Sequence, residues 1–159
     1  MLLGRGADVH EATPLYISAQ NGHEEVCKML LGCGADVDKA MSDGATPLWV
    51  SAPNGHEGIC KMLLGSRADI DKAMECGSTP LWISALKGHE GICKMLLGSG
   101  ADVHKARVDG STPLYSSSQN GHEEVCKMLL GSRADIDKAM DSGSTPFVYL
   151  CRERVRGDL

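Results

Sequence analysis

Histidine and cysteine recur together in the pattern His-x-x-x-Cys, with glutamate directly after each histidine. The four copies pair His23 with Cys27, His56 with Cys60, His89 with Cys93, and His122 with Cys126. Residues four apart share one face of a helix, as in zinc sites of the His-Glu-x-x-His type. A catalytic zinc needs a third protein ligand, and none follows at a fixed spacing. The cysteines alternate with Val/Ile and Leu at core spacing, so we interpret them as small apolar core residues and predict no metal or other cofactor.

The remaining glycine, serine, carboxylate and cysteine residues do not combine into a catalytic site. The segments at 32–34 and 98–100 are glycine-rich, but each follows a helical segment and neither completes a Gly-x-Gly-x-x-Gly motif. No serine lies in a nucleophile-elbow context, and no carboxylate pair stands apart from the repeated surface positions. Cys33 and Cys76 fall in expected turns, where we predict exposed thiols with nothing nearby to activate them. The sequence therefore predicts that the chain is not an enzyme.

All these residues belong to a repeat of 33 positions, which determines how they are placed. Thr-Pro-Leu begins at Thr13, Thr46, Thr79 and Thr112, and an altered copy begins at Thr145. Each threonine predicts a helix N-cap followed by proline at the first helical position. A second helix is expected after each Gly-His, with its apolar residues on one face. Because such short helices are marginal alone, the pairs must stack on one another.

The sequence resembles the ankyrin repeat family. Residues 44–56, Gly-Ala-Thr-Pro-Leu-Trp-Val-Ser-Ala-Pro-Asn-Gly-His, match the family pattern Gly-x-Thr-Pro-Leu-His-x-Ala-Ala-x-x-Gly-His at nearly every fixed position. The resemblance extends over residues 1 to about 147 and implies an all-α, ankyrin-type helix-turn-helix repeat solenoid with hairpin-like turns between repeats. We divide the chain into the end of a truncated repeat with a shortened turn (1–12), four repeats (13–144), and a partial fifth repeat or divergent C-terminal cap (145–159).

Several positions depart from the family pattern. The histidine after Thr-Pro-Leu is replaced each time by an aromatic residue, at Tyr16, Trp49, Trp82 and Tyr115. We expect each ring to pack between repeats with its polar atom bonded to a turn carbonyl, and a stacking surface for a ligand is the alternative. Pro53 predicts a shortened or bent first helix in the second repeat. Arg67 and Arg133 replace the C-terminal glycine, which predicts a strained left-handed conformation at both.

Composition restricts the partners and the compartment. The net charge of −5 argues against nucleic acid or an anionic membrane as partner, and no apolar run approaches the length of a membrane span. The start at Met1 has no signal-peptide pattern. Seven cysteines, four of them at one repeated position, favour a reducing, intracellular location in the cytoplasm or nucleus. We expect a monomer, or weak self-association through uncapped ends.

Information for choosing a partner is found at positions that differ between repeats. In ankyrin arrays the turn tips and first helices line the concave binding face, so these positions inherit that role by resemblance, with neutral drift as the alternative. The candidate partner-binding residues are Met41, Asp43, Trp49, Met74, Glu75, Cys76, Trp82, Leu86, Arg107, Val108, Asp109, Tyr115, Met140 and Asp141. The expected function is a non-enzymatic protein–protein interaction scaffold. The alternatives are a regulatory or ligand-binding array of a larger multidomain protein, and a fragment that folds without a partner of its own.

Overall fold

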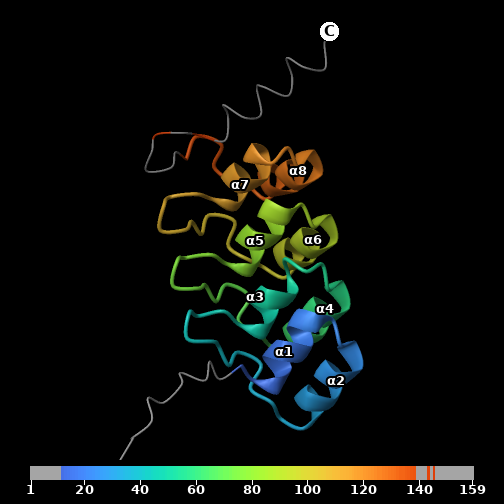
Figure 1. The fold of residues 1–159 in the computed structure, drawn as a ribbon. Coiled ribbons are helices and arrows are strands. Elements are labelled where there is room, and N and C mark those ends of the chain that lie inside the picture. Colours follow the sequence, from blue (N-terminus) through green and yellow to red (C-terminus); the bar gives the residue numbers. More distant parts are fainter. Residues whose placement is uncertain (1–11, 139–142, 144, 146–159) are drawn as a thin grey trace, which may run out of the picture.

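A computed structural model describes residues 12–138, 143 and 145, and shows helix pairs stacked in sequence order (Figure 1). Four inner helices alternate with four outer helices in this part of the chain. The inner helices are α1 (Pro14–Asn21), α3 (Pro47–Ser51), α5 (Pro80–Lys87) and α7 (Pro113–Gln119). The outer helices are α2 (Glu24–Gly32), α4 (Glu57–Gly65), α6 (Glu90–Gly98) and α8 (Glu123–Gly131). The described residues include no strand, and the expected all-α repeat architecture is confirmed.

Each inner helix begins at a capping threonine, as the Thr-Pro motif predicts. The hydroxyl of Thr79 accepts a hydrogen bond from the backbone N–H of Trp82 at 3.1 Å, and the same bond recurs at Thr13, Thr46 and Thr112. This satisfies a backbone N–H that has no partner within the helix. Proline follows at the first helical position in all four helices, where its missing N–H costs nothing.

The inner helix of the second repeat is shorter than the others. Helix α3 ends at Ser51 after 5 residues, whereas α1 and α5 contain 8 residues each. Pro53 lacks the N–H that would continue the helical ladder, and its ring is not compatible with a further turn. The prediction from Pro53 is confirmed.

The outer helices end in a left-handed residue even where glycine is absent. Gly34 and Gly100 have φ angles of 85° and 92°, and Arg67 and Arg133 each have φ 66° at the equivalent positions. The strained conformation predicted for the two arginines is confirmed. It costs about 1–2 kcal/mol for a residue with a Cβ atom.

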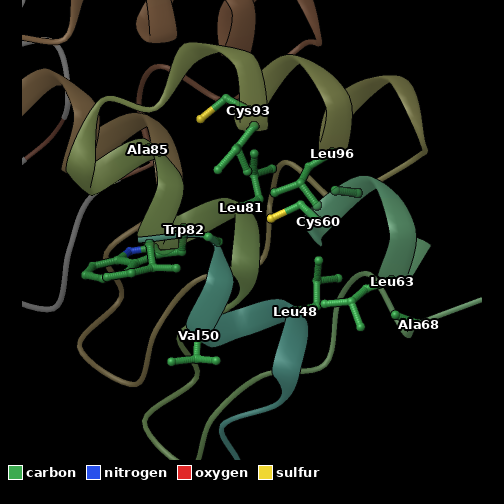
Figure 2. Packing of buried hydrophobic residues seen from close by; sticks show 14 of the residues in the cluster. Leu48, Val50, Cys60, Leu63, Ala68, Leu81, Trp82, Ala85, Cys93 and Leu96 are labelled. Atoms are coloured by element: carbon green, nitrogen blue, oxygen red, sulfur yellow. The ribbon is translucent and has the colours of Figure 1, made fainter. Parts of the chain in front are cut away.

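The core runs through the stack between inner and outer helices. Leu48, Leu63, Leu81 and Leu96 are fully buried, and Figure 2 shows them with Cys60 and Cys93 in one cluster. Neighbouring repeats therefore share one continuous apolar interior rather than forming separate cores.

Two rows of polar contacts join neighbouring repeats. The ring nitrogen Nε2 of His56, His89 and His122 bonds to a backbone carbonyl of the preceding repeat, at 3.1, 2.9 and 3.0 Å. In the loops that follow the outer helices, the carboxylate of Asp38 accepts from the backbone N–H of Asp69 at 3.0 Å. Asp71 accepts from the N–H of Asp102 in the same way at 3.1 Å. His104 stands at the next equivalent position and interrupts this aspartate row.

Candidate functional site

The repeated histidine–cysteine pairs serve the packing of the stack. The cysteines are Cys27, Cys60, Cys93 and Cys126, and all four are buried, which confirms their role as core residues. Burial raises the pKa of Cys60 to about 11 and that of Cys93 to about 12, so their thiols stay protonated and unreactive. The histidine rings of the second, third and fourth repeats are bonded to carbonyls instead of facing a shared ligand site.

The described residues also bring together no group of three or more histidine, cysteine, aspartate or glutamate side chains able to hold a metal ion. Cys33 is exposed, as predicted, whereas Cys76 is only half-buried and not fully exposed. The Cys76 carbonyl also accepts a hydrogen bond from the Val108 N–H in the next turn, at 3.0 Å.

The turn tips, defined here as residues 41–44, 74–77 and 107–110, form a connected row along one side of the stack. Each tip is closed by bonds such as Gly77 N–H to Met74 O at 2.8 Å. Neighbouring tips are joined through Glu75 N–H to Asp43 O at 2.9 Å and Val108 N–H to Cys76 O at 3.0 Å. Figure 1 shows these loops projecting away from the inner helices on the side opposite the outer helices. The row presents side chains from successive repeats next to one another.

The tip between the third and fourth repeats carries a distinctive cluster. Arg107 stands where the preceding tips have methionine, and its guanidinium carbon lies 4.7 Å from the centre of a Trp82 ring. Its Nη1 atom lies 3.3 Å from the carboxylate of Asp109, while its Nε atom is buried without a hydrogen-bond partner. A cation over an indole ring is attracted by the electron-rich face. The arginine is therefore held against the stack, and Val108 beside it projects with 70% of its surface exposed.

Asp109 shapes the same tip through the backbone. Its carboxylate accepts from the hydroxyl of Ser111 at 2.6 Å and from the Ser111 N–H at 3.0 Å. The hydroxyl hydrogen bond, with the Arg107 charge as a smaller contribution, lowers the pKa of Asp109 below its ordinary value. Asp43 makes the equivalent backbone contact with the N–H of Ala45. These contacts fix the turns while leaving a charged oxygen at the surface.

The aromatic row is part of the stack. The indole N–H of Trp82 donates to the Ser111 carbonyl at 3.1 Å, which confirms the expected bond to a turn carbonyl. Trp49 differs, because its indole N–H donates to the hydroxyl of Ser78 at 3.2 Å. Tyr16 is half-buried, and burial together with the nearby Asp43 carboxylate raises the pKa of its hydroxyl.

The predicted partner-binding residues occupy different depths of this surface. Exposed residues are Asp43, Glu75 and Val108. Half-buried residues are Met41, Trp49, Met74, Cys76, Leu86, Arg107 and Asp109. Trp82 and Tyr115 are buried within the stack. Met140 and Asp141 lie outside the described residues. The exposed and half-buried members gather on the turn tips and inner helices.

Sequence reasoning overlooked the serines that anchor the aromatic row. Ser78 and Ser111 immediately precede a Thr-Pro motif, and each accepts a hydrogen bond from a tryptophan of the preceding repeat. The stacking of Arg107 on Trp82 was likewise not predicted. A usable signal exists in the repeat register, since each serine follows its tryptophan by 29 residues.

The outer helices present a more uniform surface. Helices α2 and α8 share one sequence, EEVCKMLLG, and α4 and α6 share another, EGICKMLLG. Of the Glu–Lys pairs within the described part of the chain, Glu123 and Lys127 lie within ion-pair distance, at 2.7 Å. Exposed pairs of this kind contribute little to stability.

Comparison with known families agrees with this architecture. A family model described as ankyrin repeats (3 copies) matches residues 1–74 and again residues 66–140. A search of curated proteins found no match. None of the helices described is long and apolar enough to cross a bilayer. Ankyrin repeats are generally protein–protein interaction modules and are typically non-catalytic. Because the family match covers most of the sequence and the helix pairs follow its repeat, the chain belongs to the ankyrin repeat family.

Proposed function

We propose that the chain is a non-enzymatic scaffold that binds another protein through its turn tips and inner helices. In the family this surface forms the concave face of the array. The proposal rests on one contrast within the molecule: the outer helices repeat two sequences, whereas the tips change from repeat to repeat. A surface that selects one partner needs positions that differ from each other, because selectivity is a difference between affinities.

The tip at residues 107–110 has the features expected of residues near the centre of such an interface. Arg107 is pre-ordered by Trp82 and Asp109, so little side-chain entropy is lost when a partner binds beside it. Arginine and tryptophan are enriched among the residues that dominate binding energies. Val108 adds an exposed apolar side chain at the same place, which a partner would cover.

Charge and thiol chemistry support the remaining parts of the proposal. The net charge of −5 favours a protein over a nucleic acid as partner. Six cysteines in the described part of the chain are free, including the exposed Cys33, which supports a reducing, intracellular compartment.

The test compares two tip variants with two outer-face variants. The partner is captured with the intact chain and purified, and its affinity is then measured by calorimetry. Val108→Glu and Arg107→Met should each weaken binding at least about tenfold, which corresponds to about 1.4 kcal/mol. The controls Lys61→Ala and Lys94→Ala change exposed charges on α4 and α6 and should alter affinity less than about threefold.

Circular dichroism must first show that each variant keeps its helices. Binding that is lost in the outer-face variants and retained in both tip variants would refute the assignment of the binding face.

A further inference from the structure

The turn tips differ in charge along their row. The first tip carries Asp43 and the second carries Glu75, whereas the third carries both Arg107 and Asp109. Because Arg107 Nη1 lies 3.3 Å from the Asp109 carboxylate, the charges of these two residues offset each other. The row therefore has an acidic half at the first two tips and a neutral half at the third, where Val108 is exposed.

The two carboxylates of the acidic half belong to neighbouring residues. The backbone N–H of Glu75 donates to the Asp43 carbonyl at 2.9 Å, and both residues are exposed. Within the described residues, the Asp43 carboxylate accepts a hydrogen bond from the N–H of Ala45, and the Glu75 side chain forms no ion pair. Two like charges close together raise the free energy of the surface, and a cationic side chain placed beside them lowers it.

Lysines of the chain do not neutralise this acidic half. Lys39 and Lys72 lie just before the first two tips, but neither forms an ion pair with Asp43 or Glu75 in the part of the chain that the structure describes. The charge of Asp43 also acts on its surroundings, because burial and then this carboxylate raise the pKa of the Tyr16 hydroxyl. The first two tips therefore present uncompensated negative charge to a partner.

Val108 forms the apolar end of the row. Ser42 and Glu75 occupy the same position as Val108 in the first and second tips, and both are exposed although another tip follows each of them. The N–H of Val108 bonds to the Cys76 carbonyl at 3.0 Å, as the N–H of Glu75 bonds to the preceding tip. This position therefore faces outward even within the array, and burial of the valine by a partner stabilises a complex.

From these observations we propose that the occupant of the tip row is a basic, extended segment of the partner protein. The segment places two cationic side chains against Asp43 and Glu75, and an apolar side chain against Val108. This inference rests on the proposed function and narrows the kind of partner that the turn tips select. Because the row is acidic at one end and apolar at the other, it also fixes which end of the segment lies at which tip.

The geometry of the array sets the spacing of these side chains in the partner. Glu75 and Val108 are equivalent positions in successive repeats, and packed helices lie about 8–10 Å apart. An extended chain rises about 3.3 Å per residue, so about three residues span that distance. Asp43 lies closer to Glu75, because their backbones share a hydrogen bond. The segment should therefore carry two Lys or Arg residues within about two positions of each other, and an apolar residue about three positions beyond.

The test selects binding peptides from a displayed library of short random sequences, using the full chain with reductant present. The enriched peptides should carry the paired Lys or Arg residues and the apolar residue at the expected spacing. A synthetic copy of the most enriched peptide is then titrated into the chain by calorimetry. Its affinity should fall at least about fivefold between about 50 mM and about 500 mM salt, because salt screens exposed charges.

Variants of the tips locate the charges that the peptide uses. Glu75→Gln should weaken binding at least about threefold and Glu75→Lys at least about tenfold, since the lysine also repels the cations. Asp43→Asn should weaken it at least about threefold, because asparagine keeps a side-chain oxygen for the Ala45 N–H but loses the charge. The matched control is Glu25→Lys, which makes the same change of charge on α2 and should alter the affinity less than about twofold.

Enriched peptides without an excess of Lys and Arg, or a library that yields no binding peptide, would overturn the proposal. Equal losses of affinity in Glu75→Lys and Glu25→Lys would also overturn it, because only the net charge would then matter. If the captured partner is weakened by Val108→Glu but not by Glu75→Lys, the tips bind that partner and the basic segment is wrong. If the outer-face variants alone weaken the captured partner, both the proposed function and this inference are wrong.

Discussion

The close approach of neighbouring turns can be tested by adding one methyl group at Gly77 and measuring the loss of stability. This residue has φ +81°, and a Cβ atom built on it would lie 2.9 Å from the Cα atom of Arg107 in the next tip. That atom belongs to the backbone, so it cannot move aside as a flexible side chain could. Gly77→Ala must therefore separate the two turns and disturb the 3.0 Å bond from Val108 N–H to Cys76 O.

Gly34 provides the matched control. Its φ of +85° imposes the same left-handed strain, but a Cβ atom there would meet nothing within 4 Å. Gly34→Ala should cost about 1 kcal/mol, since strain of about 1–2 kcal/mol is partly offset by the lower entropy of the unfolded alanine chain. Gly77→Ala has the same left-handed strain and the same entropy offset, and the forced overlap with the next turn adds about 1–3 kcal/mol. We therefore expect it to cost about 2–4 kcal/mol in total.

Urea denaturation followed by circular dichroism gives the two free energies of unfolding. Gly44→Ala should behave like Gly77→Ala, because its Cβ atom would lie 3.0 Å from the Cα atom of Met74. If Gly77→Ala and Gly34→Ala agree within about 0.5 kcal/mol, the turns do not approach as described and the reasoning fails.

Three further results are expected. Thr79→Ala should lower the free energy of unfolding by about 1 kcal/mol because the Trp82 N–H loses its acceptor at 3.1 Å, and Thr79→Ser should restore most of it. The lowered pKa of Asp109 means that its stabilisation is present above its ordinary pKa of 3.8 and is lost as pH falls through the folded-state pKa. Wild type and Asp109→Asn should therefore differ in stability at neutral pH and converge in acid, as measured by thermal melts across pH. A thiol reagent should modify Cys33 and Cys76 in the folded protein, as shown by mass spectrometry. Four cysteines are buried in the core and should resist labelling, namely Cys27, Cys60, Cys93 and Cys126. Their rapid labelling would contradict the described core.

Most of the fold could be predicted from short-range patterns in the sequence. The capping threonines, the break at Pro53 and the left-handed arginines each depend on a residue and its immediate neighbours, so a repeated pattern reveals them. The core role of Cys60 could be predicted for the same reason, since its spacing from the leucines fixes the face of the helix on which it lies.

Contacts between repeats were harder to predict. That Trp82 would reach the Ser111 carbonyl, and that Arg107 would lie over its ring, depends on how far one turn is offset from the next. The sequence shows which residues recur but not this offset. The tip cluster therefore became visible only in the structure, and the partner-binding role of the tips remains a proposal.

The interruption of the aspartate row at His104 affects how the array would respond to a pulling force. Asp38 and Asp71 each tie their loop to the next through a carboxylate held by a backbone N–H. Between the loops after α6 and α8, the bond from Lys138 Nζ to the His104 carbonyl, at 3.4 Å, matches the bond from Lys105 Nζ to the Asp71 carbonyl, at 3.3 Å, in the preceding pair of loops. In the described part of the chain, no aspartate bond accompanies it there. The bonds from the Val108 N–H to the Cys76 carbonyl and from the Trp82 indole to the Ser111 carbonyl belong to the preceding pair of loops, which Asp71 also ties. If the array is stretched from its two ends, the loops that follow α6 and α8 should separate first. The array should then bend at this point before any helix unwinds.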